Sequence, residues 1–95
     1  MVVGVCRLEL LMAENHSLKG KRKVVKSLIQ RVRNRFNVSM AEIELQDVWQ
    51  RAVLGFSVVG NDHSFVNSCM DKVLNHIENM QLGDLVDSDI EIIHV

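Results

Sequence analysis

Small and apolar residues occupy every even position from Val2 to Leu10, whereas Arg7 and Glu9 stand at odd positions. A period of two is typical of a β-strand that buries one of its faces. The segment from Val2 to Met12 is therefore predicted to be a strand whose even-numbered side chains enter the core.

The following segment has the spacing of an amphipathic helix. Ser17 can act as an N-cap, and the apolar positions after it fall on one helical face. We predict a helix from about Leu18 to Asn34. Its inner face comprises Val24, Val25, Leu28, Ile29 and Val32.

Alternation returns in the middle of the chain. Between Phe36 and Leu45 the apolar residues change parity after Met40, which predicts a second strand with a bulge near Ala41. A third strand is predicted after it. This strand carries Leu54, Phe56 and Val58 on one side and Val53, Ser57 and Val59 on the other.

A second helix and a last strand complete the pattern. Gly60 to Asp62 interrupts the third strand, and a helical apolar face then continues to about Met80, where Gly83 is expected to release the helix. The tail "SDIEIIHV" alternates and is predicted to be a strand. The apolar face of the second helix comprises Phe65, Val66, Cys69, Met70, Val73, Leu74 and Ile77.

The predicted element order is β-α-β-β-α-β, which is the order of the ferredoxin-like motif. We therefore expect an α+β fold in which two helices cover one face of a four-stranded antiparallel sheet. The chain has no proline, no repeat and no low-complexity tract, and 95 residues suit a single domain, residues 1–95.

The uncovered face of such a sheet would be apolar. Large exposed apolar patches usually mark interaction sites, so a homodimer packed through this face is one hypothesis, and scattered surface aliphatic residues are the alternative. The residues expected on the dimer face are Val3, Val5, Val53, Val59 and Ile93, with Val95 at its end.

Charge is distributed unevenly along the chain. The net charge is −1, but the segment from Ser17 to Phe36 contains eight of the eleven Lys and Arg residues and none of the twelve Asp and Glu residues. Exposed helices usually mix signs, because like charges one turn apart are destabilising. Something outside the helix should therefore compensate its charge.

Three kinds of group could do so. Nucleic-acid phosphates are the first, Glu42, Glu44 and Asp47 of the same chain are the second, and an acidic protein surface or membrane headgroups are the third. The N-terminus of the helix, from Ser17 to Arg22, could also hold an anion. The candidate nucleic-acid-binding residues are Lys19, Lys21, Arg22, Lys23, Lys26 and Arg33.

Direct recognition of bases finds little support. Sheet-surface RNA binders stack bases on aromatic rings, but this chain has no Tyr, and Phe36, Phe56 and Phe65 are all expected on core faces. Trp49 is the exception, because it lies in the predicted turn beside Asp47. Either the Trp49 ring folds over the end of the hairpin, or Asp47 and Trp49 contact a partner.

Catalytic and metal signatures are missing from the sequence. No two of the four His residues have a metal-ligand spacing, and no phosphate-binding or nucleophile-elbow motif occurs. Cys6 and Cys69 are expected to be core thiols in a reducing compartment. We expect no enzyme activity, no cofactor, no metal and no membrane span, and a cytoplasmic location.

The segments "SLKGKR" and "FNVSMAEIELQDVWQRAVLGFSVVGND" resemble the YlxP-like bacterial proteins, a family of unknown function, and the likeness covers nearly the whole chain. The resemblance implies a ferredoxin-like fold and no established catalytic residue. Members often have an acidic residue where this chain has Gly20. Their genes commonly neighbour those for translation initiation factor two and ribosome-binding factor A, which implies a role near ribosomal RNA.

These observations favour a small binding protein that offers its first helix to RNA phosphates in ribosome assembly or translation. A homodimeric protein-interaction or small-ligand regulatory module without a nucleic-acid role is the alternative. An acylphosphatase-like hydrolase is a distant third, because the chain lacks the glycine-rich anion loop of that group.

Overall fold

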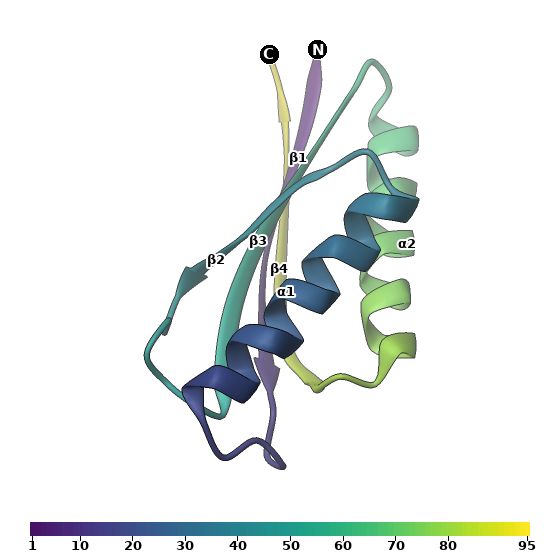
Figure 1. The fold of residues 1–95 in the computed structure, drawn as a ribbon. Helices are drawn as coiled ribbons and strands as arrows, with labels where there is room; N and C mark the ends of the chain where they lie inside the picture. Colours follow the sequence, from purple (N-terminus) through teal and green to yellow (C-terminus); the bar gives the residue numbers. More distant parts are fainter.

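A computed structural model describes all residues from 1 to 95, and the six elements follow in the predicted order (Figure 1). The ends of the elements agree closely with the predicted ones, apart from two strand starts: β2 begins at Ser39 where Phe36 was predicted, and β4 begins at Asp84 where Ser88 was predicted. The elements are β1 (Val2–Leu11), α1 (Leu18–Arg35), β2 (Ser39–Glu44), β3 (Arg51–Gly60), α2 (His63–Met80) and β4 (Asp84–His94).

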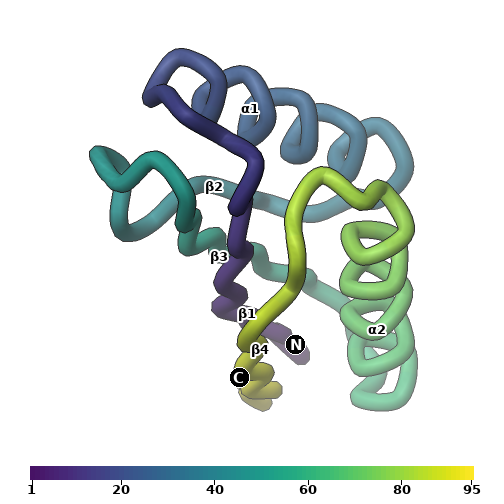
Figure 2. Tube along the Cα trace, turned by 90° about the horizontal axis from the view of Figure 1, so that it is seen from below, coloured from purple at the N-terminus to yellow at the C-terminus, as the bar shows by residue number.

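The four strands form one antiparallel sheet in the order β2-β3-β1-β4. Both helices lie on the same side of the sheet, and the other side has no helix over it (Figure 2). The predicted ferredoxin-like α+β fold is confirmed. Strands β2 and β4 are the edges, so each has one side without a hydrogen-bonded neighbour.

The core lies between the sheet and the helices. The even-numbered residues of β1 alternate with half-exposed odd ones, as the period of two predicted. The side chains from β1 and the two helices that meet in this layer include Leu8, Leu10, Val25, Leu28, Val32, Val66, Met70 and Val73. Neither helix is long and apolar enough to cross a membrane.

Side-chain caps begin both helices. The Ser17 hydroxyl accepts a hydrogen bond from the Gly20 N–H at 2.9 Å, and the Asp62 carboxylate accepts one from the Phe65 N–H at 3.0 Å. These bonds satisfy N–H groups that a helix start leaves without partners. The sequence therefore specifies the residue at which each helix begins.

Two details near β2 differ from the predictions. Phe36 is the C-cap of α1, so β2 begins at Ser39, later than expected. The irregularity in β2 lies between Glu42 and Glu44, beyond the predicted position at Ala41. Local parity located the bulge only approximately, because its position depends on pairing with β3.

Two details of α2 also differ. Phe65 was expected in the core but is 54% exposed, since it lies about 100° around the helix from Val66. The left-handed residue that ends α2 is Gln81 at φ 54°, not Gly83. An added Cβ at Gly83 would lie 3.1 Å from the Met12 side chain. The absence of a side chain at this position therefore lets the turn before β4 pass close to the end of β1.

Candidate nucleic-acid interface

Seven of the eight cations of α1 are exposed and have no carboxylate partner. The molecule has three salt bridges within 4 Å: Arg7–Glu44, Lys21–Glu42 and Arg51–Glu9. Internal pairing therefore neutralises only Lys21 in this helix. The seven exposed cations are Lys19, Arg22, Lys23, Lys26, Arg31, Arg33 and Arg35.

Lys21 must be removed from the predicted interface. Its side chain is 1% exposed, its ammonium lies 2.9 Å from Glu42 Oε2, and it donates a short hydrogen bond to the Leu45 carbonyl. The hydrogen bond of the ammonium goes to the Leu45 carbonyl. Its contact with the Glu42 carboxylate is an ion pair that lacks hydrogen-bond geometry. Lys21 thus links α1 to the end of β2, and its buried ammonium cannot contact a ligand.

The exposed cations divide among three flanks of α1, because successive residues turn by about 100°. Arg22, Lys26 and Arg33 lie on the flank that faces β2. Lys19 and Lys23 point away from the protein, on the side opposite the buried stripe of Val25, Leu28 and Val32. Arg31 and Arg35 lie on the flank toward α2, and both raise the positive potential at His76 of that helix.

The first of these flanks forms one wall of a groove of about 690 Å³ between α1 and β2. Arg33 reaches across the groove and donates to the Met40 carbonyl at 2.9 Å. Glu42 is the one acidic residue that lines the groove, and it is the residue that Lys21 neutralises. The groove therefore has an excess of positive charge.

The α2 flank holds a different constellation. Arg35 lies 3.5 Å from His76 Nδ1, and the Phe36 ring packs edge to face on the imidazole at 5.6 Å between ring centroids. Burial lowers the pKa of His76, and the nearby Arg35 and Arg31 lower it further. These surroundings therefore disfavour the protonated form of His76 beside the basic helix.

The uncovered face of the sheet is divided between ion pairs and apolar residues. Arg7 of β1 reaches over β3 to Glu44 of β2, with N to O at 3.0 Å, and its neighbour in β3 is Gly55, which has no side chain of its own. The carboxyl of Glu44 beside this guanidinium has a lowered pKa, because the hydrogen bond and the charge of Arg7 both favour its ionised form.

Val53 was assigned to the dimer face, but it is fully buried. Its cross-strand partners are Glu9 and Glu44, and both carboxylates belong to ion pairs that pass beside it. Covering by long charged side chains explains the burial, and alternation along one strand cannot reveal it. Val53 therefore cannot form part of an interface.

The other predicted dimer-face residues do form a contiguous set. Val3 pairs with Val59 on one side and with Ile93 on the other, which makes an apolar row across β3, β1 and β4. Val59 is 63% exposed and Ile93 is 42% exposed, while Val3 and Val5 are half-buried between them. The row lies at the end of the sheet where the two chain termini meet (Figure 1).

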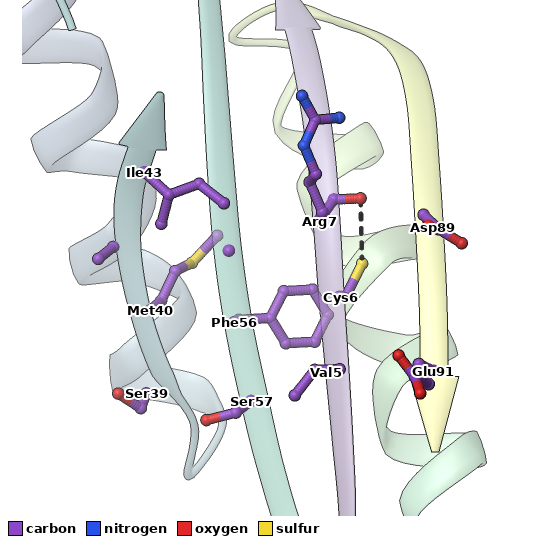
Figure 3. A pocket seen from close by; sticks show the side chains of 12 residues that line it. Val5, Cys6, Arg7, Ser39, Met40, Ile43, Phe56, Ser57, Asp89 and Glu91 are labelled. Carbon is purple, nitrogen blue, oxygen red and sulfur yellow. Dashed lines mark hydrogen bonds between the residues drawn. The ribbon is translucent and has the colours of Figure 1, made fainter. Parts of the chain in front are cut away.

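A shallow hollow of about 450 Å³ adjoins this row. Figure 3 looks onto it with the helices behind the sheet, and Val5, Ser57 and Ile43 lie around it. Arg7, Asp89 and Glu91 also line it, so charge of both signs surrounds an apolar floor. The Cys6 thiol belongs to the core side of this wall, and burial raises its pKa to about 11, which makes it a poor nucleophile.

Trp49 and Asp47 lie in the connection between β2 and β3, and both are exposed. The Trp49 carbonyl accepts a hydrogen bond from the Asn15 side chain at 2.6 Å, so this connection is tied to the turn before α1. The Trp49 residue is 53% exposed. The predicted partner contact of Asp47 and Trp49 stays a prediction.

One constellation escaped the sequence analysis. His63 Nδ1 and His94 Nε2 lie 2.9 Å apart, with the two rings nearly parallel at 14°. They are 31 residues apart in the chain and share no motif, but Val2 pairs with both Gly60 and His94 and so brings the start of α2 close to the end of β4. No group of three His, Cys, Asp or Glu side chains is arranged to hold a metal ion.

A family model described as a protein of unknown function (DUF503) matches residues 3–90 of this chain. The chain belongs to this family. It is also 36% identical over 78 residues to the uncharacterized protein YlxP of Bacillus subtilis (strain 168), an alignment that covers 82% of this chain and 85% of that protein. The resemblance drawn from the sequence motifs is therefore confirmed.

Solved structures support the fold alone. A de novo designed protein with a ferredoxin fold, determined by solution NMR, covers 98% of this chain and 83% of its own with a TM-score of 0.54 and 14% identity. The C-terminal domain LarC2 of a cyclometallase covers 98% of this chain and 56% of its own at a TM-score of 0.37 and 16% identity, which is too weak to support an argument. Neither likeness bears on the function of this DUF503 member.

Proposed function

We propose that this protein is a binding protein, not an enzyme, and that it binds the phosphodiester backbone of structured RNA through the exposed cations of α1, in ribosome assembly or translation. The observation that carries the proposal is the set of seven exposed cations with no carboxylate within 4 Å, in a chain whose net charge is −1. Phosphate groups would supply the missing counter-charge. The two unpaired thiols suit a reducing cytoplasm.

The charge pattern of α1 also opposes the stability of the helix. The first turn has no acidic residue, and it carries Lys19 and Lys21 beside the positive end of the helix dipole. Mutual repulsion along the helix adds to this cost, at a few tenths of a kcal/mol for each pair. A bound polyanion would remove both costs, so the pattern is better suited to a ligand than to stability.

The proposal predicts binding that depends steeply on salt. The affinity for a structured RNA should fall with rising KCl along a log–log line, and Arg22→Glu/Lys26→Glu should reduce the slope by about two for every RNA sequence alike. Fluorescence anisotropy over a KCl series measures this. Lys72→Glu, the exposed unpaired Lys outside α1, is the control and should leave the slope unchanged. Binding that is undetectable or independent of salt contradicts the proposal.

The apolar row on the uncovered face supports a second candidate, a homodimeric interaction module. We expect light scattering at high micromolar concentration to give the mass of two chains, and Val59→Glu to give the mass of one, because a charge buried in an apolar contact would lose its water. Phe65→Glu is the control, since Phe65 is comparably exposed on the opposite, helical side. A monomeric wild-type protein would exclude this candidate.

A further inference from the structure

Three of the exposed cations of α1 line the groove between this helix and the edge strand β2, and the other four lie outside it. We propose that a single RNA strand lies in this groove, with its phosphates against Arg22, Lys26 and Arg33, and that the outward cations Lys19 and Lys23 take no direct part. This inference rests on the proposed function, which it narrows to one flank of α1 and to the unpaired segments of a structured RNA.

The spacing along the helix suits a strand that runs parallel to it. Arg22 and Lys26 are four residues apart, or about 6 Å along the axis, and Arg33 follows two turns later. Gln30 fills the intermediate turn with an amide donor. A polar donor thus recurs once per turn, and this repeat is on the order of the separation between neighbouring phosphates in a nucleic-acid strand.

The floor of the groove differs in character from its wall. Ile29 is half-buried and Met40 is buried below the cations, so apolar carbon lies beside the charged heads. Such a surface can receive ribose and base edges while the cations hold phosphates, as in other sites for single strands. The outer edge of β2 has no neighbouring strand, so nothing closes this side of the groove.

A buried residue neutralises the one negative charge of the groove. Glu42 lines the groove and would repel phosphates if its charge stood alone. The ammonium of Lys21, 2.9 Å away and hidden from solvent, offsets that charge from below. Lys21 is thus a positioning residue, because it holds β2 against α1 and keeps the groove cationic without touching the ligand.

The size of the groove favours one strand over two. A volume of about 690 Å³ is within the range of sites for small organic molecules, so it can take a nucleotide or two but not a helix of paired strands. A duplex would have to rest on the convex outer surface of α1. There it would meet Lys19 and Lys23 at least as closely as the groove cations.

Two matched double variants test the inference. Arg22→Glu/Lys26→Glu reverses two groove cations, and Lys19→Glu/Lys23→Glu reverses two outward cations with the same spacing, the same change of charge and neighbouring positions in the helix. Circular dichroism first verifies that both variants are folded. The two probes are a fluorescein-labelled oligouridylate and a labelled RNA duplex of the same length. Fluorescence anisotropy at low salt measures the binding of each probe.

We expect the groove variant to weaken oligouridylate binding by about tenfold or more and the outward variant to weaken it by less than about threefold. Equal losses in both variants, a larger loss in the outward variant, or tighter binding of the duplex by the wild-type protein would overturn the groove while leaving RNA binding by α1 intact. If the wild-type protein binds neither probe, both the groove and the proposed function fail.

Discussion

Replacement of Lys21 by methionine should lower the free energy of unfolding by about 3 kcal/mol. Methionine keeps the packing of the aliphatic stem, but Glu42 then holds a charge at 18% exposure with no compensating cation, and the Leu45 carbonyl loses its donor. Loss of one partner of a buried ion pair typically costs 3–5 kcal/mol. We expect the lower end because Glu42 can turn partly toward water.

Urea denaturation measures this effect, and the double variant Lys21→Met/Glu42→Gln is its control. Removal of both charges leaves no unpaired ion, so the double variant should recover more than half of the loss. The single variant should also bind oligouridylate more weakly than the double variant, since only the single variant has an unmatched carboxylate in the groove. Equal stability of the two variants would show that the pair is not coupled.

Gly4→Ala should destabilise the protein by about 2–3 kcal/mol, although alanine is normally the better residue in a strand. A Cβ at this position would lie 2.2 Å from Met70 Sδ and 2.8 Å from Val66 Cγ1, both far inside ordinary contact distances. Met70 and Val66 are fully buried, so α2 would have to move away from the sheet. The glycine at position 4 sets how closely α2 approaches β1.

Gly55→Ala is the matched control, because Gly55 lies in the adjacent strand on the opposite face of the sheet. Its Cβ would meet Ile43 Cδ1 at 3.2 Å, and Ile43 is 45% exposed and can turn aside. We expect a change within about 1 kcal/mol of wild type. The double variant Gly4→Ala/Met70→Ala should lose less stability than the sum of the losses of the two single variants; strict additivity would contradict the proposed steric clash.

The elements that the sequence predicted correctly are those in which local periodicity decides burial. Every even position of β1 is buried or nearly so, and Ser17 caps α1 as expected, because each depends on neighbours within a few residues. The same reasoning failed for Phe65, whose place on the rim of α2 depends on where the helix meets the sheet. It also missed the pair His63 and His94, which only the strand register brings together.

The candidate site illustrates the same division. The sequence determined that α1 is basic and free of acids, since that is a matter of composition within one segment. It could not separate Lys21 from its neighbours, because the residue that pairs with Lys21 comes from β2, 21 positions later in the chain. Nor could it separate the groove cations from the outward ones before the position of β2 was known.

Local sequence patterns were sufficient to predict the order of the elements, the inner faces of strands and helices, and the concentration of positive charge in one helix. Only the folded chain shows that Lys21 is buried, that Val53 is covered by ion pairs, and that Arg22, Lys26 and Arg33 line one groove. Periodicity encodes which side of an element is apolar, whereas burial and pairing of an individual side chain depend on elements that are distant in the chain and are brought together only by folding.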